Sequence, residues 1–376
     1  MSRNTKYQFV YVGLKQMLAE LQDGERLPSF NSLCSRYDIS QATLNSALDL
    51  LEKDGLIRRV PKVGVYSAKS QAARREKKIT LLMPGEHEPL FAAVISVCCR
   101  FCRAHHIQLS LEFSDLDPDV ECRILDRVLH DESCDGLLFL PLFPLFETRE
   151  SLETLKKLAE VKPVVQFDRE LGNGITSFVG YDCYHDCYEA VRYLVELGHR
   201  SIGLVCASND DEKRPSERLQ GYFDALRDSG LSYDPRHTIV YDAFHPDLAN
   251  DVVEILSRPD CPRAYYYINS VYIPRFMRKA RFLGKSIPRD FSLICYDLAD
   301  VFANLPLNMT FFNEPTREAV TAALEQLQAE MECPVPSPVV RKLRGSLVEG
   351  ESCMRLETKS SINETMKTKT LLCWTN

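Results

Sequence analysis

Apolar residues near the start of the chain recur at spacings of three and four, the period of a helix that buries one face. They predict an opening helix over Tyr11–Leu21, a short helix that begins after Ser29, and a third helix that begins after Ser40. Each serine can cap the free N–H groups of the helix start that follows it, and Gly55 ends the third helix. The apolar positions expected to face a shared core are Leu14, Met17, Leu18, Leu21, Leu33, Tyr37, Leu44, Ala47, Leu48 and Leu51.

A hairpin with a basic turn follows the third helix. The segments Leu56–Val60 and Val65-Tyr66 are typical of short strands, and they flank the turn Pro61-Lys62-Val63-Gly64. Two helices joined by a tight turn and followed by such a hairpin predict a winged helix-turn-helix. In that fold the second helix of the pair lies in the major groove of DNA.

From Ile79 onward short apolar runs alternate with amphipathic helices, a rhythm that predicts parallel sheets covered on both faces. Two such series follow one another, so we expect two doubly wound lobes. Ligands should bind beyond the carboxyl ends of the strands, in a cleft that closes by a hinge motion. Strands are expected at 79–83, 108–113, 136–140, 164–167, 178–181, 201–206, 238–241, 264–268, 292–296 and 339–348. Helices are expected at 91–105, 120–130, 152–159, 184–197, 218–229, 248–256, 273–283 and 315–331.

The same pattern predicts the domain boundaries. The DNA-binding head is expected over residues 1–68, a basic linker over 69–78, a two-lobed domain over 79–350 and a tail without periodicity over 351–376. Within the two-lobed domain, one lobe is expected to combine 79–180 with 306–333, and the other 181–305 with 334–350.

Charge is distributed unevenly along the 376 residues, whose net charge is −7. Residues 1–78 hold 14 Lys and Arg against 8 Asp and Glu, a net charge of +6, whereas the remainder holds 32 against 45, a net charge of −13. A basic head on an acidic body suits a module that binds a polyanion, joined to a part that does not bind nucleic acid. An ordinary fluctuation of surface charge is the alternative.

Fourteen cysteines raise the question of a metal site. Cys98, Cys99 and Cys102 precede two histidines, and Cys183 and Cys187 flank a third. The chain has no paired C-x2-C framework, however, and both clusters fall in helical patterns where thiols pack as small apolar groups. We therefore expect no metal, no cofactor and no disulfide.

The first residues lack the apolar stretch of a secretory signal, and no apolar run is long enough to span a bilayer. We expect a soluble, cytoplasmic protein without a membrane partner. No P-loop, G-x-S-x-G elbow or H-E-x-x-H motif is present, so we expect no enzyme activity.

The head resembles the DNA-binding domain of GntR-type bacterial transcription regulators over roughly residues 6–68, from Leu27-Pro28-Ser29 through the third helix to the wing. The resemblance implies DNA contacts from the residues at the matching positions. Arg58 and Lys62, the basic residues of the hairpin, are expected to add two more contacts. Together these residues are Ser29, Gln41, Thr43, Asn45, Arg58, Lys62 and Gly64. Family members usually carry Arg in place of Gln41 and Asn45, and a Gly-x-Gly wing tip. Since Arg pairs with guanine and Gln or Asn with adenine, we expect an altered operator preference.

The body resembles the effector domain of LacI/GalR-type repressors over roughly residues 78–352. The motifs that carry this resemblance are Phe167-Asp168-Arg169, Asp182, Leu197-Gly198-His199-Arg200, Arg218-Leu219-Gln220-Gly221-Tyr222, Ile268-Asn269, Ile287-Pro288 with Asp290 and Ser292, and Tyr296-Asp297. A GntR-type head on such a body is similar to the arabinose-repressor (AraR-like) subgroup. The resemblance implies a periplasmic-binding-protein-like fold of type I, a homodimer on a palindromic operator, and a sugar as effector in the cleft.

Four residues are candidates for ligand contact by their place in these motifs: Phe91, Arg218, Asn269 and Asp297. Arginine, carboxylate and amide groups suit vicinal hydroxyls, and an aromatic ring suits the C–H face of a sugar. The alternatives are a surface arginine at a helix start, an Asp297 that only caps the next turn, and a phenylalanine in the core. Asp168, Arg169 and Asp182 are expected to act as structural and hinge residues.

The sequence therefore predicts a DNA-binding repressor controlled by a small ligand, with double-stranded DNA, a sugar and a second copy of the chain as partners. A ligand sensor with a vestigial head is the alternative function. A transporter's solute-binding protein is disfavoured by the winged helix, and a pyridoxal-phosphate enzyme by the short body.

Overall fold

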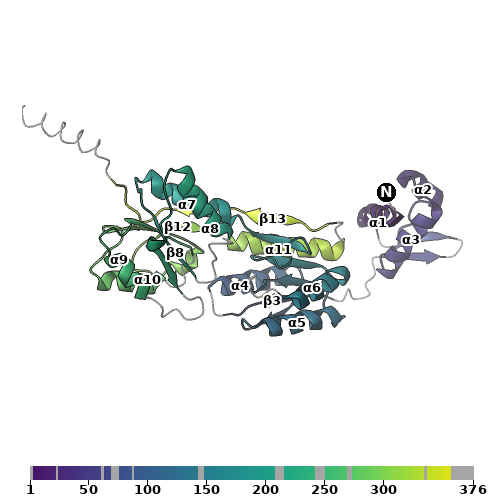
Figure 1. Cartoon of the computed structure of the whole chain (residues 1–376). Helices are drawn as coiled ribbons and strands as arrows, with labels where there is room; N and C mark the ends of the chain where they lie inside the picture. The colour runs from purple at the N-terminus through teal and green to yellow at the C-terminus, as the bar shows by residue number, and fades with distance from the viewer. Residues whose placement is uncertain are drawn as a thin grey trace, which may run out of the picture. The chain divides into compact units, whose positions relative to one another are not determined.

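The structure is a computed structural model of the chain (Figure 1), and it divides into two compact units, Met1–Lys77 and Lys78–Asn376. The described residues are 3–22, 24–60, 63–68, 76–86, 89–142, 148–207, 216–241, 250–268, 273–333 and 337–356. Within these ranges, no helix combines the length and the apolar character that crossing a membrane requires.

The first unit has the expected winged helix-turn-helix. Its elements are α1 (Arg3–Glu20), α2 (Phe30–Tyr37), α3 (Gln41–Lys53), β1 (Ile57–Val60) and β2 (Gly64–Ser67). The apolar stripes of the three helices meet in one core that includes Leu14, Leu33 and Leu48, all at most 1% exposed. Between α2 and α3 the chain turns at Asp38 in the left-handed region, with φ of 50°.

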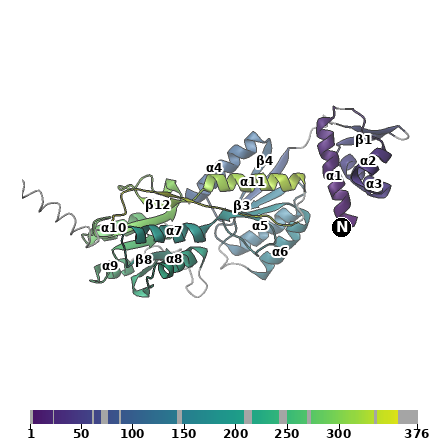
Figure 2. The same cartoon turned by 90° about the horizontal axis from the view of Figure 1, so that it is seen from above.

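The second unit begins with a six-stranded sheet in the order β13-β7-β6-β5-β3-β4. Its strands are β3 (Lys77–Met83), β4 (Ile107–Phe113), β5 (Gly136–Phe139), β6 (Val164–Phe167), β7 (Ser177–Tyr181) and β13 (Val340–Leu343). The helices that pack on it are α4 (Pro89–Ala104), α5 (Pro118–His130), α6 (Arg149–Val161) and α11 (Thr316–Glu332). Helices α4 and α11 share one core with the sheet, and α5 and α6 share another (Figure 2).

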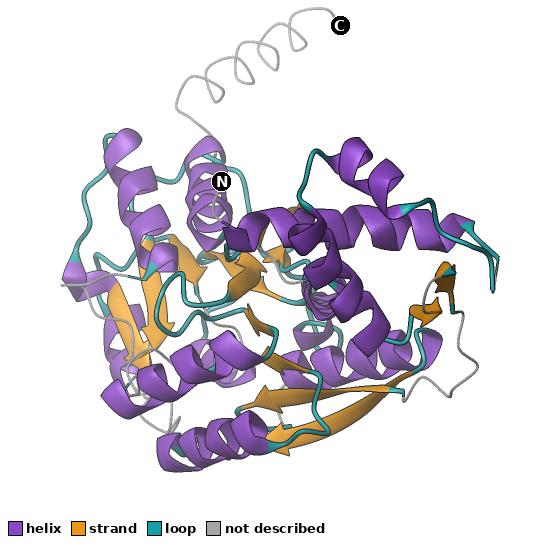
Figure 3. Ribbon diagram, turned by 90° about the vertical axis from the view of Figure 1, so that its right-hand side faces the viewer, coloured by secondary structure: helices purple, strands orange, loops and turns teal. Residues whose placement is uncertain are grey.

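A second six-stranded sheet follows the order β14-β12-β11-β10-β8-β9, parallel except for β14. Its strands are β8 (Gly203–Ala207), β9 (Thr238–Tyr241), β10 (Ala264–Tyr267), β11 (Ser292–Asp297), β12 (Thr310–Asn313) and β14 (Ser346–Val348). Its helices are α7 (Cys183–Glu196), α8 (Glu217–Asp228), α9 (Asn250–Ser257) and α10 (Ile273–Phe282), with two 3-10 turns, η2 (Pro235–His237) and η4 (Ala299–Val301). Figure 3 shows helices along both faces of the strands. The expected fold of a winged helix and two doubly wound sheets is confirmed.

The chain passes three times between the two sheets: from β7 to α7, from β12 to α11, and from β13 to β14. This division differs from the expected lobe ranges. Strand β12 pairs with β11 in the second sheet, although residues 306–333 were expected in the first lobe. The expected strand 339–348 is two strands, because β13 pairs with β7 in the first sheet and β14 pairs with β12 in the second. Gly345 lies between them, where a Cβ would come within 2.7 Å of both Asp186 and the Asn313 carbonyl.

The expected tail is partly packed. The Ser352 hydroxyl donates to the Leu293 carbonyl at 2.6 Å and accepts from the Thr310 N–H at 2.8 Å, so it joins β11 to β12. The Leu356 N–H donates to the Leu197 carbonyl at 2.8 Å. Because residues 351–356 are held by hydroxyl and backbone hydrogen bonds, their sequence shows no periodic apolar pattern. For this reason the sequence predicted a tail. Residues 357–376 lie outside the described ranges.

This packing predicts that Ser352→Ala lowers the free energy of unfolding by about 1–3 kcal/mol, because the buried Thr310 N–H loses its acceptor. Urea unfolding of the full chain measures the change. Ser257→Ala, at the exposed end of α9, is the control and should shift stability by no more than about 0.5 kcal/mol. Equal effects of the two variants would contradict the packed position of Ser352.

Candidate functional site

The surface of α3 offers the side chains expected to reach DNA. Ser40 caps the helix, and its hydroxyl accepts from the Thr43 N–H at 3.3 Å and lies 3.0 Å from the Thr43 hydroxyl. Because the apolar stripe of α3 is buried, Gln41 and Asn45 are exposed, four residues apart on one face. The arrangement is suited to reading neighbouring bases with two amide side chains.

The other predicted DNA contacts lie around this helix. Ser29 is exposed and caps α2, accepting from the Ser32 N–H at 3.3 Å. Arg58 is exposed on β1, and Gly64 has a φ of 152°, with Arg26 so close that a Cβ would meet its Nε at 2.8 Å. Lys62 lies outside the described residues.

In the second unit, Arg218 lies at the start of α8, the helix that follows β8. Its Nη2 is 2.9 Å from Glu314 Oε1, its Nη1 donates to the Ile268 carbonyl at 3.4 Å, and its Cζ lies 4.8 Å from the centre of the Tyr296 ring. Ile268, Tyr296 and Glu314 stand at the carboxyl ends of β10, β11 and β12. Arg218 therefore occupies the edge of the sheet where open α/β folds bind ligands, and it is not an ordinary surface arginine.

Glu314 was not among the predicted site residues. Its side chain is only 5% exposed, and burial raises its pKa, as do Asp297, Asp168 and Asp186, while Arg218 opposes that shift. The signal that could have found it is local: a carboxylate directly follows the apolar strand β12, at the point where the chain returns to the first sheet.

Asp297 is the last residue of β11. Its Oδ1 accepts from the Leu298 N–H at 2.9 Å, so it caps the following turn, and its backbone carbonyl accepts from the Glu314 N–H at 3.2 Å. Its carboxylate also lies near enough to Glu314 to raise the pKa of that group. Asp297 thus belongs to the Arg218 cluster and caps a turn as well. Asn269 lies outside the described residues.

Phe91 lies at the start of α4, which follows the carboxyl end of β3, but its side chain is buried. It is 4% exposed and packs with Met83 and Val94 in the core of the first sheet. The structure places it in the core, the alternative to a stacking wall, because α4 turns this position towards the sheet.

The first sheet has its own polar edge. Asp168 follows β6 with a φ of 63°, and its carboxylate lies 3.4 Å from Arg169 Nε. Arg169 also donates to the Pro141 carbonyl at 3.2 Å. Nearby, Glu121 of α5 accepts from the Leu142 N–H at 2.8 Å, and burial raises the pKa of Glu121 to about 7.

Three members of the two cysteine clusters are buried in apolar cores, whereas Cys99 is exposed and Cys183 lies beside Tyr296 and Arg218. Cys98 and Cys102 are buried between α4 and the first sheet, where burial raises the pKa of Cys102 to about 11. Cys187 is buried beneath α7 and accepts a hydrogen bond from Tyr266. In the described part of the chain, no group of three or more His, Cys, Asp and Glu residues is arranged to hold a metal ion.

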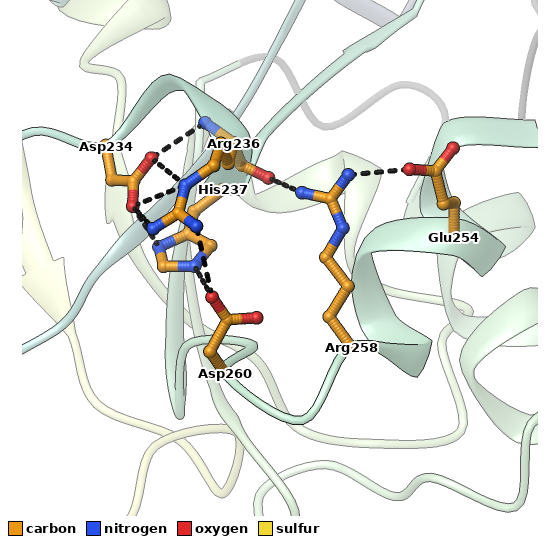
Figure 4. Close-up of polar contacts among 6 residues, drawn as sticks. All are labelled: Asp234, Arg236, His237, Glu254, Arg258 and Asp260. Atoms are coloured by element: carbon orange, nitrogen blue, oxygen red, sulfur yellow. Dashed lines mark hydrogen bonds and ion pairs between the residues drawn. The ribbon is translucent and has the colours of Figure 1, made fainter.

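A separate charged network lies at the amino end of β9 (Figure 4). Arg236 Nη2 lies 2.5 Å from Asp234 Oδ2, and Arg236 Nη1 lies 3.6 Å from Asp260 Oδ2. Arg258 Nη2 lies 2.6 Å from Glu254 Oε1. Parallel strands place this network at the opposite end of the sheet from Arg218.

The raised pKa of Glu121 predicts a pH-dependent effect of Glu121→Gln. Below the usual range of a glutamate, wild type and variant should be equally stable. Between the usual pKa of a glutamate and about 7, the unfolded chain ionises this carboxyl while the folded chain keeps it protonated, so the wild type loses stability that the variant keeps. At pH 8 the variant should be more stable by about 1–3 kcal/mol in urea unfolding. Asp126→Asn, exposed on α5, is the control; a Glu121 effect that is the same at pH 5 and pH 8 would contradict the account.

Comparison with known proteins supports both halves of this description. Residues 6–66 match the family model for bacterial regulatory proteins of the gntR family, and residues 191–353 match that for the periplasmic binding protein-like domain.

Individual relatives match different shares of the chain. The arabinose metabolism transcriptional repressor of Halalkalibacterium halodurans is 24% identical over 327 residues, which cover 84% of this chain and 86% of that protein. The probable opine utilization operon repressor of Rhizobium rhizogenes is 31% identical over 163 residues, 42% of this chain and 82% of that protein. The solved complex of the transcriptional regulator CelR with cellobiose has a TM-score of 0.61 at 22% identity, and the match covers 84% of this chain and 91% of that one. The chain therefore belongs to the family of bacterial transcription regulators in which a GntR-type winged helix precedes a periplasmic-binding-protein-like domain, and it is a ligand-controlled, DNA-binding regulator.

Proposed function

We propose that the chain is a repressor that releases its operator when a sugar or sugar derivative binds at the Arg218–Glu314 pair. The observation that supports this most strongly is the pair itself, a guanidinium and a carboxylate 2.9 Å apart at the carboxyl ends of the strands. Both groups hydrogen-bond vicinal hydroxyls well. The relative that was solved with cellobiose shares this fold.

In the proposed mechanism, ligand hydroxyls replace part of the contacts that Arg218 now makes with Glu314 and Ile268. Glu314 lies on the segment that leads from β12 to α11, so a change at the pair acts directly on a connection between the sheets. This segment also contacts the connection from β7 to α7, since the Tyr181 hydroxyl at the end of β7 donates to the Thr316 hydroxyl at 3.1 Å. A useful response requires a coupling of about 1–3 kcal/mol between the ligand and DNA sites.

On the DNA side, we propose that Gln41 and Asn45 read adenine edges in the major groove and that Ser29, Thr43, Arg58, Lys62 and Gly64 contact the backbone. We further propose a homodimer on a palindromic operator, acting in the cytoplasm without catalytic activity. Two half-sites one helical turn apart would match two heads.

The proposal is tested by mixing the purified protein with genomic fragments, sequencing those that stay bound, and repeating with a panel of sugars. We expect one short palindrome to be enriched and then lost with one sugar. The double variant Arg218→Ala with Glu314→Gln should bind the same palindrome but fail to respond to that sugar, because the ligand contacts are gone. Both charges are removed together, so neither is left buried without a partner.

Arg227→Ala, on the same helix at a side chain that is 70% exposed, is the matched control and should respond like the wild type. A double variant that still responds would contradict the assignment of the ligand site. Absence of any enriched sequence at low salt, where phosphate contacts are strongest, would contradict the repressor and favour a sensor with a vestigial head.

Asn45→Arg should change the base preferred at one operator position from adenine to guanine, because Arg pairs with guanine O6 and N7. The discrimination against the original base should be about 1–3 kcal/mol, measured by selection from a random duplex library. Gln16→Arg adds the same charge on the exposed face of α1 and should leave the preference unchanged. An unchanged preference in both variants would show that Asn45 does not read bases.

A further inference from the structure

Two neighbouring arginines on β1 have different surroundings. Side chains of successive strand residues point to opposite faces. Arg58 is exposed, whereas the side chain of Arg59 is only 28% exposed and turns towards α3. The two arginines of β1 are therefore expected to have different roles.

All the described polar contacts of the Arg59 side chain are with α3. Its Nη2 lies 2.7 Å from Asp49 Oδ1 and donates to the Asn45 carbonyl at 3.3 Å, and its Nε lies 3.3 Å from Glu52 Oε2. Its backbone N–H also donates to Glu52 Oε1 at 3.1 Å. Residues 45, 49 and 52 follow helical spacing, so one side chain holds two turns of α3 along a single face.

We propose that Arg59 is a positioning residue that fastens the wing to the recognition helix, and that it makes no phosphate contact of its own. Two carboxylates already balance its charge, which leaves Arg58 as the described cation of β1 that is open to DNA. The inference rests on α3 being the helix that binds DNA. It adds a role for a residue outside the predicted set of DNA contacts.

The wing is also held from its other side. The Arg26 Nη2 donates to the Val63 carbonyl at 2.5 Å, close to the tip of the hairpin. The backbone of Leu27 donates to the Val65 carbonyl at 2.9 Å, which fixes the segment before α2 against β2. With Arg59 on one side and Arg26 on the other, the wing is oriented before DNA arrives, and binding then needs less ordering of the hairpin.

The geometry requires arginine at position 59. A guanidinium is a planar fork that can contact Asp49, Glu52 and the Asn45 carbonyl together, whereas an ammonium is a compact point charge. A phosphate contact behaves differently, because lysine binds phosphate well as a point charge. Replacement by lysine therefore separates the two roles.

The test measures the affinity of the full-length protein for the duplex that it enriches, and for a duplex of arbitrary sequence, over a series of salt concentrations. Arg59→Lys should weaken binding to the enriched duplex about fivefold, with an unchanged salt slope. Arg58→Lys, the matched control, should stay within about twofold, since its charge is kept. On the arbitrary duplex, Arg58→Ala should reduce the salt slope by about 0.9 and Arg59→Ala should leave it unchanged.

A second variant tests the positioning role without changing Arg59 itself, so that a folding defect of the Arg59 variants cannot account for the result. Glu52→Gln removes a negative charge next to the DNA-binding surface, and simple electrostatics predicts tighter binding. The positioning role predicts weaker binding to the enriched duplex, because Arg59 loses a partner. Wild-type affinity of Arg59→Lys, tighter binding by Glu52→Gln, or a salt slope reduced by about 0.9 in Arg59→Ala would each overturn the proposal.

Discussion

A guanidinium that is mostly enclosed by protein needs a counter-charge, and Glu314 supplies it for Arg218 at 2.9 Å. The architecture of the body brings these two residues together. Strand β8 leads towards the helix that carries Arg218, and β12 ends immediately before Glu314, from which the chain returns to the first sheet. The pair thus joins a helix of the second sheet to a connection between the sheets. A ligand that competes for either partner acts where the two halves of the body are linked.

In the head, too, an arginine connects two elements. Caps and apolar stripes determine how α3 is rotated, and that rotation leaves Gln41 and Asn45 exposed. Charge then determines the position of the wing, because Arg59 pairs with α3 while its neighbour Arg58 remains exposed. In both units a buried or half-buried arginine connects two elements of the fold. Its planar guanidinium can contact several acceptors at once, which a lysine ammonium does less well.

Local patterns predicted most of the fold. Caps such as Ser40 and the stripe that contains Leu48 lie within one helix, and the apolar strands of both sheets are short continuous runs, so neighbouring residues suffice to identify them. What the sequence did not show depends on pairing between distant segments. Residues 340–343 and 346–348 read as one strand but join different sheets, and Ser352 is buried only because β11 and β12 lie beside it. Arg218 was found by its motif, whereas its partner Glu314, 96 residues away, was not.

In the proposed mechanism, ligand and operator compete through one shared equilibrium. Binding free energies coupled in this way are reciprocal: each partner must weaken the other by the same factor. The decisive measurement is therefore the affinity of the effector sugar for the full-length protein, determined by calorimetry with and without saturating operator duplex. We expect the operator to weaken sugar binding by about 5- to 150-fold, the same factor by which the sugar weakens operator binding. Equal sugar affinity in the two titrations would contradict this mechanism.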